Sequence, residues 1–204
     1  MTDRGVDEDK RATLRRFAAL GATIPAGLAA SGSASAAEGS DAREALVGYL
    51  SATPGAHFSK VRDDLRLGTG ETQHHLRQLI ADGAIVREDD GDYARYYPAE
   101  TFSATERTAL AALRKETPRA MILALLRSPG QSGASLAEAV GVSRPTISRY
   151  AGSLESSGVL DRDDGYRLAQ PETVLALVVR YADSFDADAV ALAGEADELI
   201  AFDP

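Results

Sequence analysis

Between residues 42 and 100, apolar positions follow first a helical period and then an alternating one. Ala42, Leu46 and Leu50 are four residues apart, as on one face of an α-helix. Gly83 stands where a helix end favours a left-handed residue, and an Asp-Gly pair at 90–91 between β-forming residues is typical of a hairpin. The predicted order is a helix ending at Pro54-Gly55, a short helix at about 59–65, a turn at 67–69, a third helix at about 70–82 and a hairpin over 85–97.

The same arrangement recurs 75 residues further along the chain. Pro54-Gly55 corresponds to Pro129-Gly130, and Gly83 corresponds to Gly158. Because the shared residues are core and turn positions, two copies of one unit are the economical interpretation. The predicted elements of the second copy are helices at about 119–127, 135–140 and 144–157 and a wing over 160–168.

Helix, helix, turn, helix and hairpin in this order make a winged helix-turn-helix. The predicted fold class is therefore mainly α with small β-hairpin wings: two tandem winged helix-turn-helix units plus C-terminal helices. A helical pattern over 105–116 predicts a connecting helix that Pro118 breaks, and patterns over 172–185 and 187–202 predict two amphipathic helices after the second wing. The predicted organisation is a flexible or leader-like segment at 1–40, a first winged helix-turn-helix at 41–100, a connecting helix at 101–118, a second winged helix-turn-helix at 119–170 and C-terminal helices at 171–204.

The C-terminal helices carry more apolar surface than a small wing can cover. Their stripes include Val174, Leu175, Val179 and Val190. Winged-helix proteins commonly bind two-fold symmetric DNA sites as dimers. A homodimer through these helices is therefore predicted.

Composition removes most catalytic and metal chemistry. The chain has no cysteine, so thiolate zinc sites and cysteine nucleophiles are excluded. Its three histidines are His57, His74 and His75, and the adjacent pair would point about 100° apart on a helix, which disfavours one shared metal. No phosphate-binding glycine loop and no paired catalytic carboxylates are visible. The sequence predicts a protein that is not an enzyme and has no metal and no cofactor.

The net charge of −9 is unusual for a DNA-binding protein, which normally carries a basic surface. Seven acidic residues and no basic one follow Arg180, so the rest of the chain is near neutral. An acidic, lysine-poor and alanine-rich composition is also similar to that of proteins from halophilic archaea. In their salt-rich cytosol phosphate attraction is screened, so a strongly basic face is less necessary.

Three segments carry a family resemblance. Gly55-Ala56-His57-Phe58, Gly70-Glu71-Thr72-Gln73-His74-His75-Leu76 and the wing segment 90–98 resemble the archaeal tandem winged-helix regulators related to the ArsR and MarR superfamily. The segment Gly141-Val142-Ser143-Arg144-Pro145-Thr146-Ile147-Ser148-Arg149-Tyr150 resembles the recognition segment of the same superfamily. The resemblance covers about residues 41–170 and implies transcription regulation through double-stranded DNA.

The candidate DNA-binding residues lie on the third helix of each unit, because a recognition helix presents its N-terminal, outward-facing residues to base edges. In the second unit these are Ser143, Arg144, Thr146, Ser148, Arg149 and Tyr150. In the first unit they are Gln73, His74 and Arg77, with Arg95 as the clearest wing contact. Glu71 and the wing aspartates make the first unit the weaker DNA binder, and a scaffolding role without DNA contact stays open for it.

Residues 1–40 resemble an export signal in part. Arg15-Arg16 precede a short apolar run, and Ala34-Ser35-Ala36 has the small-residue form of a cleavage site. Leu14 stands where a twin-arginine motif needs its first arginine, and acidic residues dilute the positive charge. A flexible tail after a short helix is the favoured interpretation, and tethering to a membrane by residues 14–36 stays open.

Two functions follow from these observations. The first is a homodimeric, cytoplasmic, sequence-specific DNA-binding transcriptional regulator. The alternative is a membrane-tethered or protein-binding winged-helix sensing module, which the acidic wings and the leader-like segment favour. The operator sequence, the direction of regulation and the effector do not follow from the sequence.

Overall fold

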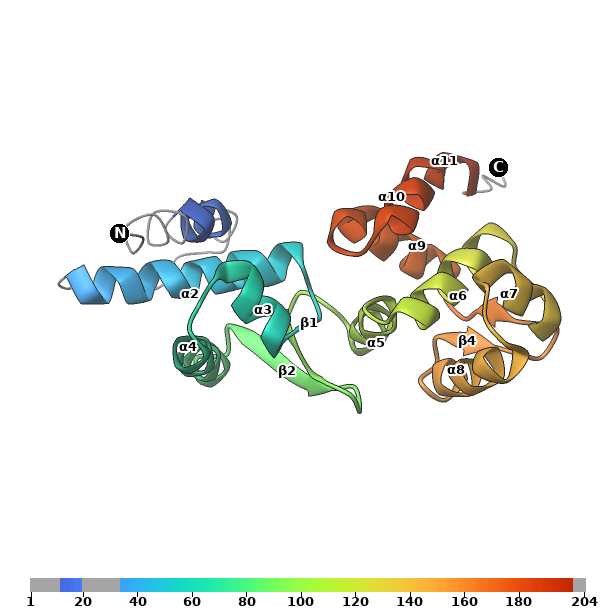
Figure 1. Cartoon of the computed structure of the whole chain (residues 1–204), viewed down its shortest axis with the longest axis horizontal. Helices are drawn as coiled ribbons and strands as arrows, with labels where there is room; N and C mark the ends of the chain where they lie inside the picture. Colours follow the sequence, from blue (N-terminus) through green and yellow to red (C-terminus); the bar gives the residue numbers. More distant parts are fainter. Residues whose placement is uncertain (1–11, 20–33, 200–204) are drawn as a thin grey trace, which may run out of the picture. The chain divides into compact units, whose positions relative to one another are not determined.

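The computed structural model describes residues 12–19 and 34–199 of the 204-residue chain (Figure 1). The chain divides into two compact units, Met1–Phe102 and Ser103–Pro204, and each is described by itself. Both units contain the predicted succession of helix, helix, turn, helix and hairpin. This confirms the predicted fold class, mainly α with small β-hairpin wings and helices after the second unit.

The first unit packs its helices against a three-stranded antiparallel sheet of order β1-β3-β2. Strand β1 pairs Ala56 with Tyr96, and the sequence gave no sign of it because two residues carry no alternating pattern. Buried Leu46, Leu50 and Val61 lie in the core beneath the sheet. The elements are a helix at 12–19, α2 (Ala34–Ala52), β1 (Ala56–His57), α3 (Phe58–Leu65), α4 (Thr69–Ala81), β2 (Ile85–Asp89) and β3 (Ala94–Pro98).

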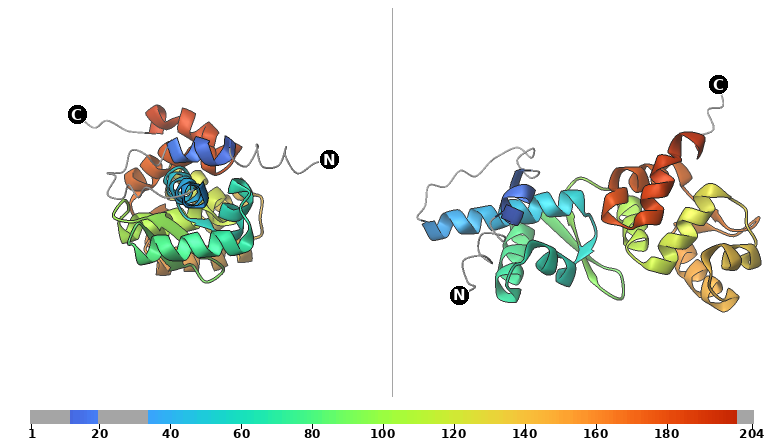
Figure 2. Two further views of the ribbon diagram at one scale, coloured as in Figure 1. Left: turned by 90° about the vertical axis from the view of Figure 1, so that its left-hand side faces the viewer. Right: turned by 45° about the horizontal axis from the view of Figure 1, so that its top comes forward.

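The helix at 12–19 is part of the first unit's core. It lies beside α2, Leu14 is buried, and the Phe17 ring meets the Tyr49 ring edge-on at 5.2 Å (Figures 1 and 2). The predicted domain boundary at residue 41 falls inside α2, and the small-residue segment 34–36 forms the first residues of that helix. The prediction that separated residues 1–40 from the first unit missed this packing. Residues 20–33 lie outside the described residues.

The second unit has the same helix order with a shorter, two-stranded wing. Buried Met121, Ile122, Leu136 and Ile147 form its centre. The elements are α5 (Ala104–Leu113), α6 (Glu116–Arg127), α7 (Gly133–Val140), α8 (Arg144–Ser156), β4 (Leu160–Asp161), β5 (Arg167–Leu168), α9 (Pro171–Tyr181), the 3-10 turn η1 (Ala182–Ser184), α10 (Ala187–Gly194) and α11 (Ala196–Leu199).

Pro118 lies inside a helix and does not break one. Helix α6 begins at Glu116, so the proline occupies its first turn, where a backbone N–H has no partner within the helix. The connecting helix α5 already ends at Leu113. The predicted boundary between connecting helix and second unit at residue 118 is therefore about two residues late.

The C-terminal helices cover the second unit. Val174, Leu177, Val178 and Leu192 are buried, α9 packs on α5, and α10 packs on α9 and α6 (Figure 2). The interpretation that these stripes need a second chain is wrong for most of their length, because the chain's own helices α5 and α6 cover them. Val179 and Val190 remain 44% and 45% exposed.

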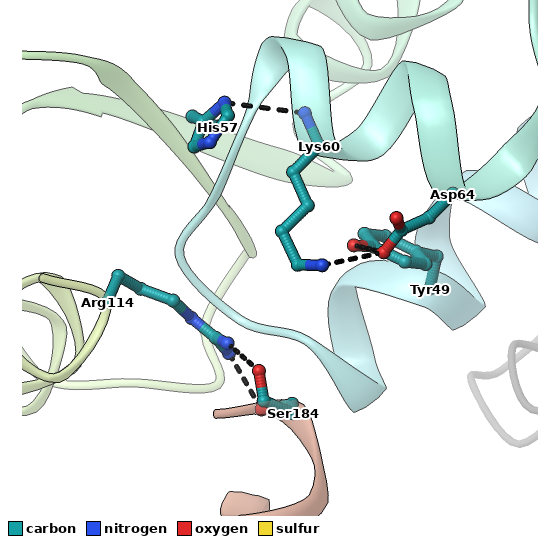
Figure 3. A network of polar contacts seen from close by, with 6 residues as sticks. All are labelled: Tyr49, His57, Lys60, Asp64, Arg114 and Ser184. Atoms are coloured by element: carbon teal, nitrogen blue, oxygen red, sulfur yellow. Dashed lines mark hydrogen bonds and ion pairs between the residues drawn. The ribbon is translucent and has the colours of Figure 1, made fainter. Parts of the chain in front are cut away.

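Arginines of α5 and α6 fasten this cover. Arg114, at the end of α5, donates to the backbone oxygen of Ser184 at 2.6 Å and to its hydroxyl at 2.9 Å (Figure 3). Arg119 pairs with Asp186 at 2.6 Å, and Arg127 pairs with Glu195 at 2.9 Å. Two acidic residues of the C-terminal region therefore serve as internal partners. The predicted continuous helix over 187–202 ends at Gly194, is followed by α11, and its last three residues lie outside the described residues.

The repeat extends to single hydrogen bonds. Gly55 N–H donates to Tyr96 O at 2.9 Å, and Gly130 N–H donates to Tyr166 O at 2.9 Å. The offset is 75 residues up to the wing and 70 after it, because the second wing is five residues shorter. The correspondence makes Arg95 the counterpart of Gly165.

Candidate nucleic-acid interface

Helix α8 is the third helix of the second unit, and its first turn is held in place by side chains. The Ser143 hydroxyl accepts from the Thr146 N–H at 3.4 Å and lies 2.9 Å from the Thr146 hydroxyl. Pro145 presets the first turn. Ile147, Ala151 and Leu154 are buried, so the opposite face of the helix is directed outward.

The structure brings the predicted residues of α8 together on its N-terminal half. Ser143, Arg144, Ser148 and Arg149 are exposed, and Thr146 and Tyr150 are half-buried. The hydroxyls of Ser143 and Thr146 are engaged in the cap. Arg144, Ser148 and Arg149 therefore carry the polar groups that face outward.

Arg144 and Arg149 bring unpaired positive charge to this face. Among the described residues Arg144 takes part in no ion pair, and the Arg149 guanidinium lies 4.6 Å from the centre of the Tyr150 ring. Near the other end of α8, Arg162 pairs with Glu155, and this hydrogen bond lowers the pKa of the Glu155 carboxyl. Positive charge without a partner is thus concentrated at the start of the helix, where a recognition helix meets DNA.

Helix α4 is the corresponding helix of the first unit. Gln73, His74 and Arg77 are exposed, as predicted from the pattern, whereas His75 points inward with Leu76 and Leu79. Glu71 accepts from the Gly68 N–H at 3.2 Å and so places a carboxylate at the helix start. A carboxylate there disfavours a DNA phosphate.

Arg95 is not a wing contact, contrary to the sequence-based prediction. Its side chain is 2% exposed, its guanidinium donates to Gly55 O at 2.9 Å, and it pairs with Asp90. Burial opposes ionisation of Asp90, but hydrogen bonds from the Tyr93 N–H and from Arg95 outweigh it and lower the pKa of the carboxyl. The direction of a side chain in β3 was not recoverable from a segment that reads aromatic on both sides of the arginine.

The other basic residues around the first unit's wing and α3 are also paired. Arg87 binds Asp89 through two hydrogen bonds of 2.9 and 3.0 Å. Lys60 donates to Asp64 at 3.0 Å, and Asp64 also accepts from the Tyr49 hydroxyl at 2.7 Å (Figure 3). These pairs tie α3 to α2 and neutralise positive charge that DNA would otherwise attract.

The histidines have local roles in the first unit. His57 Nδ1 accepts from the Lys60 N–H at 3.3 Å, which caps α3, and its ring stacks on Tyr93 at 4.7 Å. His75 Nδ1 is buried and has no hydrogen-bond partner. Burial lowers the pKa of both side chains. Within residues 12–19 and 34–199 no group of three or more histidine or carboxylate side chains could hold a metal ion.

Arg66 is a feature that sequence reasoning missed. It follows the last residue of α3 with φ 55° and ψ 36°, a left-handed conformation that costs a non-glycine residue roughly 1 kcal/mol. The repeat could have pointed to it, because the corresponding residue in the second unit is Gly141, with φ 74°.

Comparison with known proteins agrees with the two-unit arrangement. Residues 40–110 match a family model described as an N-terminal HTH domain, and residues 114–161 match one described as winged helix-turn-helix DNA-binding. Searches of curated proteins and of solved structures gave no match. Within the described part of the chain, no helix has the length and apolar character needed to cross a membrane. Two helix-turn-helix domains in one chain indicate a DNA-binding regulator rather than an enzyme.

Proposed function

We propose that the chain is a sequence-specific transcriptional regulator that recognises double-stranded DNA with the N-terminal half of α8. The observation that carries this proposal is the pair Arg144 and Arg149, exposed on that helix and without an ion-pair partner among the described residues. Most arginines near them, such as Arg119, Arg127 and Arg162, are held by carboxylates. Arginine that is left unpaired at a reading position is available to bases and phosphates.

The two arginines have different expected roles. Arg149 lies in the second turn of α8, where an arginine can form two hydrogen bonds with the O6 and N7 atoms of guanine. The Tyr150 ring beside it restricts its side chain, which reduces the entropy lost on binding. Arg144 is the first residue of the helix, a position suited to a backbone phosphate. Ser148 lies between them and supplies a hydroxyl for either kind of contact.

The first unit contributes less to this recognition. Gln73 is suited to adenine, and His74 and Arg77 are suited to phosphates. Because Glu71 and the acidic wing face the same DNA, we propose that α4 adds affinity and little sequence preference. The resemblance to archaeal ArsR and MarR regulators and the salt-rich cytosol that it implies stay predictions.

A homodimer is the proposed binding form. Val179 and Val190 are exposed apolar residues on α9 and α10, two helices that pack on each other, and dimers suit two-fold symmetric sites. Deleting residues 171–204 would uncover the core of the second unit, so point variants give the cleaner test. Val179→Asp and Val190→Asp should convert a dimer to a monomer in light scattering, and a dimer that persists in the double variant would exclude this surface.

The test of the function is selection of bound duplexes from a random pool at several salt concentrations. The wild-type chain should enrich one sequence motif, and the variant Arg144→Ala/Arg149→Ala should enrich none. Arg180→Ala is the matched control, because Arg180 is exposed on α9 of the same unit and away from α8. A wild-type chain that binds DNA without any enrichment would contradict sequence specificity.

A further inference from the structure

We propose that Arg66 binds a DNA backbone phosphate, so that the first unit also holds DNA. This inference rests on the proposed function, since it assigns a second contact to the same duplex. Neither the match to helix-turn-helix models nor the pattern of the reading helices includes this residue. The turn between α3 and α4 and its counterpart in the second unit supply the argument.

The two turns have the same backbone. In the first unit Arg66 N–H donates to Asp63 O at 3.2 Å and Leu67 N–H donates to Arg62 O at 3.0 Å. In the second unit Gly141 N–H donates to Glu138 O at 3.2 Å and Val142 N–H donates to Ala137 O at 3.1 Å. Both turns therefore place a left-handed residue at the end of the second helix.

Glycine is the residue that such a turn favours, and the second unit has it. Arginine at the same position adopts the left-handed region against its own preference. The backbone of the turn thus gives no reason for an arginine at residue 66. Residues held in a disfavoured backbone conformation often serve a function through their side chains.

The position of Arg66 indicates what that function is. Arg66 is exposed and stands three residues before Thr69, the first residue of α4. In the second unit the counterpart of Thr69 is Arg144, the first residue of α8. Each unit therefore has one arginine at the start of its third helix, at a different position in the turn.

The charge at residue 66 also answers the acidic start of α4. The Glu71 carboxylate lies at that helix start through its bond to Gly68 N–H, and it would repel a phosphate there. An arginine in the preceding turn supplies the opposite charge and a donor geometry that matches phosphate oxygens. Such a contact fixes the first unit on the duplex and carries no sequence information.

The variant Arg66→Gly separates a structural role from a binding role. Glycine relieves the backbone conformation, so the unfolding temperature should stay the same or rise. DNA affinity should fall about tenfold on cognate and scrambled duplexes alike, as for the loss of one charged hydrogen bond. The slope of log affinity against log salt concentration should become shallower by about 1, because one phosphate contact is lost.

Two further variants secure the interpretation. Arg66→Lys keeps the charge and should retain most of the salt slope, whereas Arg66→Asn tolerates the left-handed conformation without charge and should behave as Arg66→Gly. Unchanged affinity and slope in Arg66→Gly and Arg66→Asn would overturn the inference while wild-type binding still supports the proposed function. A wild-type chain that binds no duplex at any salt concentration would overturn both.

Discussion

The two units share a backbone plan but distribute their arginines in opposite ways. In the second unit Arg144 and Arg149 stand outward on α8 and have no carboxylate partner among the described residues. In the first unit Arg87 and Arg95 are both bound by wing aspartates, and Arg95 is buried. The repeat conserves core and turn positions within one chain, while the charged positions differ. Shared fold therefore does not imply an equal share in DNA binding.

The length of the wing explains part of this difference. In the second unit Gly165 lies against the backbone of Gly130, and a Cβ there would lie 2.5 Å from the Gly130 oxygen. In the first unit the longer wing leaves space at the corresponding position, and the Arg95 guanidinium fills it by donating to Gly55 O. A glycine and a buried arginine thus solve the same contact between wing and turn.

The largest expected effect is on stability and tests the role of Arg95. Arg95→Ala should lower the free energy of unfolding by roughly 3 to 5 kcal/mol, because it leaves the Asp90 carboxylate buried and unpaired. Chemical denaturation of the full chain measures this change. Arg87→Ala is the matched control, since its pair with Asp89 is exposed and worth about 1 kcal/mol or less. Equal losses in the two variants would show that Arg95 is not the interior support of the wing.

The next effect tests the close contact in the second wing. Gly165→Ala should destabilise the chain by about 2 to 4 kcal/mol, since it combines a left-handed alanine with overlap against a backbone oxygen. Gly91→Ala in the first wing shares the positive φ but meets no atom within 4 Å. It should cost about 1 kcal/mol, the conformational part alone. The difference between the two denaturation midpoints measures the contact, and no difference would contradict it.

The pattern of the sequence predicted the helices of both units well, because apolar spacing and the glycines at 83 and 158 are local signals. It did not predict which surface covers which. Leu14 joins the first core from a segment taken as a leader or tail, and α5 and α6 cover the stripe of α9. These contacts join residues far apart in the chain, and no local period records them.

The candidate site was predictable to a different degree on the helices and on the wing. On α8 and α4 the helical period separates outward from inward positions, so Arg149 and Arg77 lie where expected. On β3 the residues Ala94, Tyr96 and Tyr97 give no clear alternation around Arg95. The direction of Arg95 follows from the wing length and from Asp90, and neither is a local property of the strand.

The expected effect on DNA binding compares the two reading helices directly. Arg149→Ala should weaken binding to the cognate duplex by about 1 to 3 kcal/mol and relax the preference at one base pair, as for the loss of a bidentate contact. Arg77→Ala should have a smaller effect that is the same for every sequence. Titrations with cognate and scrambled duplexes at fixed salt distinguish them. If Arg149→Ala keeps the cognate-to-scrambled ratio and Arg77→Ala abolishes it, sequence recognition belongs to the first unit.

The smallest expected effect is a pH dependence confined to the first unit, because residues 103–204 contain no histidine. Burial lowers the pKa of His57 and His75 below the ordinary value of 6.5, so the unfolded chain binds these protons more readily. Stability from this source is complete above pH 6.5 and decreases as the pH falls from there through the lowered values. Acidification to about pH 5 leaves most carboxylates ionised and isolates the histidines.

Denaturation at about pH 7.5 and about pH 5 measures this dependence. The variant His57→Asn/His75→Leu should lose it, because asparagine can still cap α3 and leucine suits the buried position. His74→Asn is the control and should keep the wild-type dependence, since His74 is exposed on α4. The first unit should be the one that opens at low pH, which proteolysis followed by mass mapping detects as cleavage before residue 103. Cleavage confined to residues after 103 would show that the acid-sensitive unit is the second one.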